Sequence, residues 1–368
     1  MPRSTATATS QEGTSKSLVT YLCGRPGGSP ALARRPQTSP RLGRWVSRDD
    51  YVAYLEAFAA HHRLDVRFGA EVTRIVPSAG HRWVATTSGG DVRCDDIVVA
   101  TGHEHLPWTP GWPGLDDFAV PVAHTSSRRS VAGLAGQRVL LVGAGNSGIE
   151  FAEQLVRAGV AGLWLSMRTP PTLMPLQVAG VPLQPVAVSL ARLPEKWRDA
   201  VARRISRLAL GDLAPFGLPA PAQGPYERLR TSGVTAAVDR GFAAHLKAGR
   251  LTIVPEIDRL DGTRVVLRDG RVLRPDIVLA ATGYRPGLEA MVGHLGVLDT
   301  DGLPTAAAAP GLWFVGYRPS LNGNLRLHPA EARRVADTIT RSRPTARRTS
   351  PRRVPFPRRF ADCRCGGG

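Results

Sequence analysis

One glycine-rich turn constrains the fold of this 368-residue chain more than any other feature of its sequence. The turn follows the apolar run 139–142 and leads into residues 149–155, where apolar side chains recur at helical spacing. A strand, a GxGxxG turn and a helix in this order form the unit whose backbone amides and helix N-terminus bind a pyrophosphate. The sequence therefore predicts a dinucleotide-binding site in mid-chain, formed by Gly143, Ala144, Gly145, Asn146, Ser147 and Gly148.

The same unit continues into a second strand. Residues 138–165 are typical of a strand, a crossover helix and a second, parallel strand. Arg168 lies twenty residues after Gly148, where sites that prefer NAD usually carry an acid for the ribose 2′-hydroxyl. Because a guanidinium binds a 2′-phosphate through charge-assisted hydrogen bonds, Arg168 indicates NADPH, with a solvated surface arginine as the alternative.

Helix and strand signals extend on both sides of this unit. Ser47, with Asp50 three residues later, is typical of a helix N-cap. Short apolar runs separated by Gly-containing turns predict a small β-meander that returns to a sheet. The predicted strands are 18–22, 66–68, 71–76, 82–86, 97–100, 251–254, 264–267 and 277–280, and a helix is predicted at 195–210. The strands 97–100 and 277–280 both run into the tripeptide Ala-Thr-Gly.

The net charge of +18 is concentrated at the two ends of the chain. Residues 1–48 hold 8 Lys or Arg and 1 acid, residues 341–368 hold 9 and 1, and residues 49–340 therefore hold 31 and 28. The end segments lack hydrophobic periodicity, which favours solvated segments over a nucleic-acid-binding arm. The sequence accordingly predicts no specific nucleic-acid partner.

The cysteines and histidines indicate neither a disulfide framework nor a metal site. Four cysteines without a CxxC pair fit a reducing cytoplasm, which is the predicted location. His103 and His105 lack a third ligand at suitable spacing, as do Cys363 and Cys365, so no metal is predicted. No stretch reaches the roughly 20 apolar residues of a membrane span, and no membrane association is predicted.

The order of several further motifs resembles that of the flavin-containing monooxygenases, especially the group of the plant YUCCA enzymes and their bacterial relatives. Two segments that contain Ala-Thr-Gly, at 95–102 and 281–285, bracket the glycine-rich turn. Shorter matching pieces lie at 54–58, 211–218, 224–225, 311–316 and 331–336. The resemblance covers roughly residues 47–340.

This resemblance implies an α/β fold with two dinucleotide-binding, Rossmann-like domains, in which the NADPH domain is inserted into an incomplete FAD domain. Beside the glycine-rich turn and Arg168, it assigns cofactor contacts to Thr101, Gly102, Thr282, Gly283 and Gly316. The expected regions are an irregular, disordered N-terminal segment (1–46), a first, truncated segment of the FAD domain (47–125), the NADPH-binding domain (126–282), a second segment of the FAD domain (283–340) and a disordered basic tail (341–368).

The resemblance also implies a reaction. NADPH would transfer a hydride to FAD, and the reduced flavin would activate oxygen for transfer to a small organic substrate, while the protein orients and shields both cofactors. No catalytic side chain is predicted, because the cofactor carries the chemistry. The motifs select neither an oligomeric state nor one substrate, although an aromatic 2-oxo acid is among the candidates.

Three positions depart from the family pattern. The motif F-x-G-x-x-x-H-x-x-x-[YF] retains Phe118 and His124 but has Val120 and Arg128 at its other two positions. We expect a linker role for the retained Phe and His. Glu104 stands where relatives often carry an Asn near the flavin. Either this Glu changes the polarity beside the flavin, or it belongs to an ordinary polar loop.

The largest departure lies at the N-terminus. Residues 1–46 contain no FAD fingerprint, so we expect a truncated FAD unit, and stretches at both ends have the composition of GC-rich sequence read out of frame. The alternative is an NADPH-binding remnant or regulatory protein with weak or no flavin binding. A nucleic-acid-binding function through the basic ends ranks last. A disulfide reductase is argued against by the missing CxxC pair.

Overall fold

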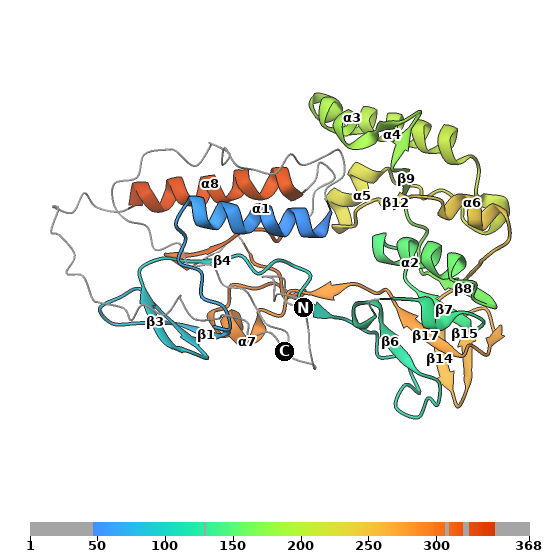
Figure 1. The fold of residues 1–368 in the computed structure, drawn as a ribbon, viewed down its shortest axis with the longest axis horizontal. Coiled ribbons are helices and arrows are strands. Elements are labelled where there is room, and N and C mark those ends of the chain that lie inside the picture. The colour runs from blue at the N-terminus through green and yellow to red at the C-terminus, as the bar shows by residue number, and fades with distance from the viewer. Residues whose placement is uncertain (1–46, 129, 306–308, 319–323, 343–368) are drawn as a thin grey trace, which may run out of the picture.

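The computed structural model describes residues 47–128, 130–305, 309–318 and 324–342. Its elements form two groups in Figure 1, one around β7, β8 and β17 on the right and one around β4 and α7 on the left. The predicted strand 18–22, the rest of the N-terminal segment and residues 343–368 lie outside the described residues. Arg341 and Ser342, the first two residues of the predicted tail, instead end helix α8.

The first group is built on a parallel five-stranded sheet with the strand order β13-β8-β7-β17-β6. Its central strand is buried on both faces, since Val139 and Leu141 belong to one hydrophobic core and Leu140 to another. This burial explains the uninterrupted apolar run in the sequence. The strands are β6 (Val122–His124), β7 (Arg138–Val142), β8 (Gly162–Ser166), β13 (Thr252–Val254) and β17 (Ile277–Ala280).

Helix α2 (Asn146–Arg157) connects β7 to β8, which confirms the predicted βαβ unit. Its residues Ile149, Ala152 and Leu155 are buried at three-residue spacing and pack in the same core as Leu141. The other face of the sheet packs against a three-stranded antiparallel sheet. Its strands are β14 (Ile257–Asp261), β15 (Arg264–Leu267) and β16 (Val272–Leu273).

The remaining elements of the first group form a long excursion between β8 and β13, whose helices lie above α2 in Figure 1. Helix α4 has the predicted bounds, Glu195–Leu210. The other elements are β9 (Leu173–Pro175) paired in parallel with β12 (Ala237–Asp239), the hairpin of β10 (Gln177–Val178) and β11 (Val181–Pro182), and the helices α3 (Leu183–Ser189), α5 (Pro225–Ser232) and α6 (Phe242–Lys247). Short 3₁₀ helices in this group are η2 (Thr125–Ser127), η3 (Ala132–Leu134), η4 (Leu190–Arg192) and η5 (Ala214–Phe216).

The second group contains an antiparallel meander and a two-stranded parallel sheet. Ile75, Trp83, Val292 and Leu312 are buried in its core, and Trp83 Nε1 donates to the carbonyl oxygen of Pro310 at 3.0 Å. The meander consists of β1 (Val72–Pro77), β2 (Trp83–Thr87) and β3 (Gly90–Cys94), and β4 (Ile97–Val99) pairs in parallel with β19 (Leu312–Phe314). The helices are α1 (Arg48–His61), α7 (Glu289–Val292), η6 (Gly293–Leu295) and α8 (Asn324–Ser342).

Two chain segments connect the groups, and they pair with each other as the antiparallel strands β5 (Leu106–Pro107) and β18 (Tyr284–Arg285). Each follows one of the two Ala-Thr-Gly tripeptides. The second tripeptide directly follows β17 of the five-stranded sheet, and the first follows β4 of the two-stranded sheet. The repeated sequence ending therefore marks the point where each segment leaves its sheet.

Most of the predicted elements within the described residues are confirmed, and one is wrong. Ser47 is the N-cap of α1, because its hydroxyl oxygen accepts a hydrogen bond from the Asp50 N–H at 3.1 Å. Residues 66–68 form no strand: Phe68 is 66% exposed, and Gly69 turns the chain with a φ of 71°. Its aromatic and β-branched residues fit a strand locally, but no neighbouring strand among the described residues pairs with them.

Candidate dinucleotide-binding site

The first glycine of the turn meets a backbone requirement. Gly143 directly follows β7, has a φ of 103°, and donates its N–H to the Ser166 carbonyl oxygen of β8 at 2.9 Å. A Cβ at this position would lie 2.4 Å from the Ala281 carbonyl oxygen, a distance that no real side chain tolerates. Glycine is therefore needed here both for the positive φ and for the close approach of β17.

The last glycine meets a packing requirement. A Cβ at Gly148 would lie 1.9 Å from the Gly143 carbonyl oxygen and 3.6 Å from the Cβ of Ala281. The first turn of α2 can therefore sit against the end of β7 only if this position has no side chain. This close helix–strand contact is the one expected of the third glycine of a dinucleotide fingerprint.

The described residues give no such reason for the middle glycine. A Cβ at Gly145 would meet no heavy atom within 4 Å, and its φ of −74° suits any residue. Gly145 is the N-cap of α2 without a capping side chain, and Gly145, Asn146 and Ser147 are exposed. The missing side chain leaves free backbone N–H groups at a helix N-terminus open to an anion.

Asn146 has a structural role in the same turn. Its Oδ1 accepts a hydrogen bond from the Val238 N–H at 3.0 Å, and its Nδ2 donates to the Ala236 carbonyl oxygen at 3.4 Å. This side chain therefore fixes the start of α2 on β12. The buried carboxylate of Glu153, further along α2, accepts from the N–H groups of Arg240 and Phe242 at 3.0 and 3.2 Å and fixes the start of α6.

Arg168 lies two residues beyond the end of β8 and is exposed. No carboxylate among the described residues lies within ion-pair distance of its guanidinium. The loop that follows it is bound by Arg228 of α5, which donates to the Pro170 carbonyl oxygen and the Thr169 hydroxyl. Sequence reasoning missed this contact, although Gly224-Pro225 before Arg228 is a recognisable helix start.

The parallel pairing of β4 and β19 aligns the ends of these two strands. Three predicted residues therefore lie near one another there, and we call them the second cluster, after the glycine-rich turn: Thr101, Gly102 and Gly316. The Thr101 hydroxyl lies 2.7 Å from the Tyr317 hydroxyl, and burial raises the pKa of Tyr317 above its ordinary value. The N–H of Gly316 donates to a Glu331 carboxylate oxygen at 3.1 Å. The fold thereby brings the adjacent predicted residues Thr101 and Gly102 together with Gly316, which is more than 200 positions away in the sequence.

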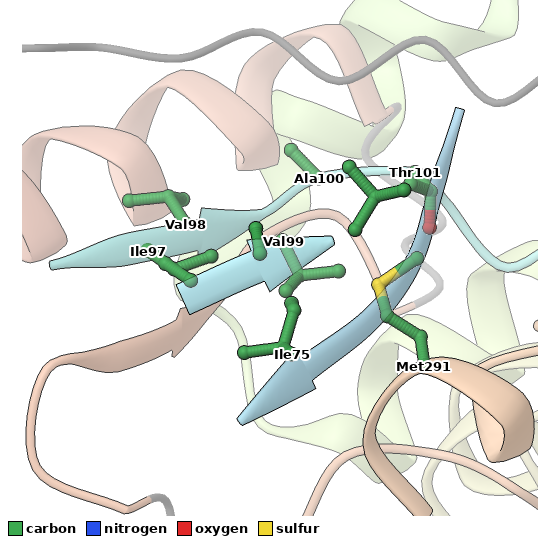
Figure 2. Close-up of a pocket in the computed structure, with 9 residues that line it drawn as sticks. Ile75, Ile97, Val98, Val99, Ala100, Thr101 and Met291 are labelled. Atoms are coloured by element: carbon green, nitrogen blue, oxygen red, sulfur yellow. The ribbon is translucent and has the colours of Figure 1, made fainter. Parts of the chain in front are cut away.

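An apolar pocket lies beneath this second cluster, between the meander, β4 and α7 (Figure 2). Among its lining residues only Thr101 carries a polar side chain, and that hydroxyl is bonded to Tyr317. The pocket therefore offers apolar surface but no group for a phosphate. The lining residues are Val72, Ile75, Ala85, Ile97, Val98, Val99, Ala100, Thr101 and Met291.

Thr282 and Gly283 lie next to the glycine-rich turn, where the second connecting segment leaves β17. We call the point where a connecting segment leaves its sheet a crossing. The Thr282 hydroxyl donates to the Trp108 carbonyl oxygen of the other connecting segment. The Gly283 carbonyl oxygen accepts from the Trp108 N–H and from His124 Nε2, both at 3.0 Å. The Ala281 N–H donates to the Val142 carbonyl oxygen at 2.7 Å, so this crossing and the turn share one edge of the sheet.

His124 is the residue that joins the crossing to the sheet. Its Nε2 bonds the Gly283 carbonyl oxygen, while its Nδ1 accepts from the Ser126 N–H at 3.2 Å, which selects the neutral tautomer protonated at Nε2. Burial lowers the pKa of His124 below its ordinary value, although the Gly283 bond acts in the opposite direction. The ring also packs edge-on against Tyr284 at 5.0 Å between centroids.

Two further positions of the family comparison, the departure Glu104 and the retained Phe118, have ordinary structural surroundings. The Glu104 side chain is 72% exposed and lies 3.8 Å from His103 Nε2, which places it in solvent. The partly buried Phe118 packs against the core of Leu140 and Leu267.

No group of three or more His, Cys, Asp or Glu among the described residues could hold a metal ion. None of the helices in the described ranges is long and apolar enough to cross a membrane.

The sheet, the glycine-rich turn and its exposed helix start define an α/β dinucleotide-binding protein. Comparison with known proteins narrows this class. A family model described as pyridine nucleotide-disulphide oxidoreductase matches residues 25–171. Indole-3-pyruvate monooxygenase YUCCA1 of Oryza sativa subsp. japonica is 33% identical over 272 residues, which cover 73% of this chain and 67% of the rice protein. Probable indole-3-pyruvate monooxygenase YUCCA3 of Arabidopsis thaliana is 30% identical, with 74% and 66% covered.

Solved structures agree on the fold. A mutant flavin monooxygenase from Stenotrophomonas maltophilia is similar with a TM-score of 0.60 and 22% identity, covering 89% of this chain and 84% of that one. The cyclohexanone monooxygenase of Rhodococcus sp. Phi1 bound to NADP+ is similar with a TM-score of 0.52 and 19% identity, covering 82% and 71%. The chain belongs to the flavin-containing monooxygenase family, and the predicted α/β fold class is confirmed. It spans about two thirds of the length of the two plant relatives.

Proposed function

We propose that this chain is an FAD- and NADPH-dependent, monooxygenase-like oxidoreductase that acts on a small organic molecule. Family membership supports the reaction type, and the exposed turn at Gly145 supports the nucleotide site. The plant relatives are named indole-3-pyruvate monooxygenases. We therefore propose aromatic 2-oxo acids as the first substrate class to test. When bound, NADPH supplies the hydride, and FAD receives it and activates oxygen for transfer to the substrate.

The residues of the glycine-rich turn fit NADPH. Gly143 and Gly148 are explained by contacts within the protein, whereas Gly145 leaves backbone exposed, and no atom of the described residues accounts for the glycine. We propose that the pyrophosphate binds at Gly143–Gly148 over the start of α2, with Ala144 and Ser147 contributing backbone N–H groups. Arg168, at the end of the second strand, would hold the 2′-phosphate.

The residues of the second cluster fit the flavin side of FAD. A Cβ at Gly102 or Gly283 would meet nothing within 4 Å, so both leave backbone open at the crossings. Within the described residues, His328 Nε2 is buried without a hydrogen-bond partner, and its ring lies 3.6–3.8 Å from where a Cβ of Gly316 would stand. An unpartnered buried nitrogen beside a buried glycine with a φ of 89° suits a polar ligand. We propose that Thr101, Gly102, Thr282, Gly283 and Gly316 border the flavin.

In this proposal the chain's own residues position the cofactors. The bond between His124 and the Gly283 carbonyl oxygen fixes one crossing, and the Thr101–Tyr317 bond fixes the end of β4. We propose that residues 47–125 and 283–340 form the FAD domain, that residues 126–282 form the inserted NADPH domain, and that the protein works in the cytoplasm. The scarcity of cysteines and the absence of a CxxC pair support this location.

The observation that carries the proposal is the open space at Gly145, and substitution of this residue tests it. In Gly145→Ala, a methyl group stands where the pyrophosphate must approach, so the Kd for NADPH should rise roughly tenfold while the fold is unchanged. Gly133→Ala is the matched control, because its Cβ would also meet nothing within 4 Å and it lies in η3, before β7. Equal NADPH affinity in both variants would contradict the proposed nucleotide site.

A further inference from the structure

Arg228 binds the loop that follows Arg168 through two separate hydrogen bonds. Its Nη1 donates to the Pro170 carbonyl oxygen at 2.5 Å, and its Nη2 donates to the Thr169 Oγ1 at 3.1 Å. One guanidinium therefore fixes both the backbone and a side chain of the two residues after Arg168. The donor and acceptor are 58 and 59 positions apart in the sequence, so only the tertiary fold brings them together.

The helix that carries Arg228 has a fixed starting point. The buried carboxylate of Asp199, on α4, accepts from the Tyr226 N–H at 2.8 Å and from the Glu227 N–H at 3.2 Å. A Cβ at Gly224 would lie 2.2 Å from the Asp199 Cγ, so the chain passes as close to this carboxylate as a glycine allows. Arg228 therefore extends toward the loop from a helix, α5, whose start is fixed by hydrogen bonds. Its position is more restricted than that of an arginine on a free surface.

No described residue neutralises the charges of Arg168 and Arg228. Among the described residues, no carboxylate forms an ion pair with Arg168 or Arg228, whereas the neighbouring Arg230 is paired with Glu195 at 3.1 Å. Burial lowers the pKa of Arg228 below its ordinary value, yet a guanidinium remains charged at neutral pH. The exposed Thr169 thus directly follows the exposed Arg168 in the sequence and is bonded by the guanidinium of Arg228.

The bond from Arg228 also sets the direction of that hydroxyl. Thr169 Oγ1 accepts from Arg228, and no acceptor for its own hydrogen occurs in the described ranges. The hydroxyl is therefore available as a donor, bonded to the Arg228 guanidinium and carried by the residue after Arg168. A phosphate monoester dianion requires N–H and O–H donors of this kind, whereas a ribose 2′-hydroxyl makes no use of two unpaired cations.

We propose that Arg228 is a positioning residue that sets the preference of this site for NADPH over NADH. It does so by holding Thr169 and Pro170 so that Arg168 and the Thr169 hydroxyl face the ribose 2′-phosphate. The inference rests on the proposed function, in which Arg168 binds that phosphate. It adds a residue from a distant helix that acts on the nucleotide through the loop.

Binding of NADPH and NADH to Arg228→Gln tests the inference. The Kd for NADPH should rise roughly tenfold, while the Kd for NADH stays within about twofold, because only the 2′-phosphate loses donors. Arg230→Gln is the matched control, because it removes the same charge from the same helix without touching the loop. A purely structural role of Arg228 would weaken both nucleotides alike, and that result would overturn the inference.

A second variant keeps the test decisive if Arg228→Gln does not fold. Arg228→Lys retains the charge but cannot reach both acceptors with a fork of donors, so the affinity for NADPH should fall by roughly threefold and that for NADH should not. Equal affinities in the wild type and Arg228→Lys would then overturn the inference.

Arg168→Ala separates this inference from the proposed function. If Arg168→Ala removes the preference for NADPH and the Arg228 variants leave it unchanged, the positioning role is wrong and the phosphate site stands. If Arg168→Ala leaves the preference unchanged, the proposed 2′-phosphate site is wrong, and the inference that rests on it is wrong as well.

Discussion

The two groups of elements differ in how completely their helices are packed. Helix α2 of the first group buries Gly148, Ile149, Ala152, Glu153 and Leu155. In the second group, no residue of α1 or α8 whose exposure is described is fully buried, and Leu55 of α1 is 45% exposed. The sheet of the first group has strands on both sides of β7, whereas β4 and β19 are the only strands of the second group's parallel sheet within the described residues.

We infer from this difference that the first group is stabilised mainly by its own residues and that a bound cofactor contributes more to the stability of the second group. Parallel sheets are normally covered on both faces, and the five-stranded sheet meets this requirement with two cores of its own residues. The second group covers one side of β4 with the meander and α7. We expect bound FAD to contribute more to the stability of the second group than NADPH contributes to the first.

The largest effect is expected from matched leucine substitutions in the two groups. Leu141 has no exposed surface, so Leu141→Ala should lower the free energy of unfolding by about 3 kcal/mol through lost burial and a cavity. Leu55→Ala on α1 should change it by about 0.5 kcal/mol or less. Urea unfolding of both variants measures the difference. If Leu55→Ala lowers the free energy of unfolding as much as Leu141→Ala does, α1 is packed as closely as β7 in solution. That result would contradict the difference between the two groups.

Cofactor addition should act on the two groups separately. FAD at a hundredfold excess over its Kd should slow amide hydrogen exchange in α1, α8 and β4. The free energy of opening in these elements should rise by up to about 2.7 kcal/mol. NADPH should instead slow exchange at residues 143–148 and in the first turn of α2. Hydrogen-exchange mass spectrometry with each cofactor alone resolves the two patterns. Equal protection of α2 and α1 by FAD would contradict separate sites.

A smaller effect is expected at His124, which joins the sheet of the first group to the crossing at Gly283. Burial lowers the pKa of His124 in the folded state below the ordinary value of 6.5, so the unfolded chain binds a proton more readily. The stability therefore falls as the pH drops below 6.5 and is unaffected above it. His124→Gln keeps a donor for the Gly283 carbonyl oxygen but does not titrate, and its Tm should depend less on pH in this range. Identical pH profiles of both proteins would show that His124 is not buried in solution.

The smallest effect is expected from the exposed pair of Arg138 and Asp276, which ties β7 to β17. Hydrogen bonds from the Arg138 side chain and N–H lower the pKa of Asp276 to about 2, with Nη2 at 2.6 Å from Oδ1. The stabilisation is present above the ordinary value of 3.8 and is lost as the pH falls toward 2. Asp276→Asn should unfold at slightly lower urea than the wild type at pH 7 and at the same urea near pH 2. A large loss at pH 7 would mean that surface contacts, and not its core, stabilise the first group.

The sequence predicted the features that depend on neighbouring residues. The βαβ unit and the Ser47 cap are confirmed because their signals lie within a few positions of each other. The predicted strand 66–68 was wrong because a strand needs a partner, which local composition does not reveal. The motif spacing drew attention to His124, but its partner at Gly283, 159 positions away, came only from the fold. Arg228 was missed for the same reason, since its acceptors lie in a distant loop.

The flavin absorbance of the purified protein is the most direct test of the central claim that this chain binds FAD and NADPH for a common reaction. We predict that the protein, as purified or after addition of FAD, shows a protein-bound flavin band. Under anaerobic conditions, NADPH should bleach this band faster than NADH does. A colourless protein that neither takes up added FAD nor oxidises NADPH would contradict the account.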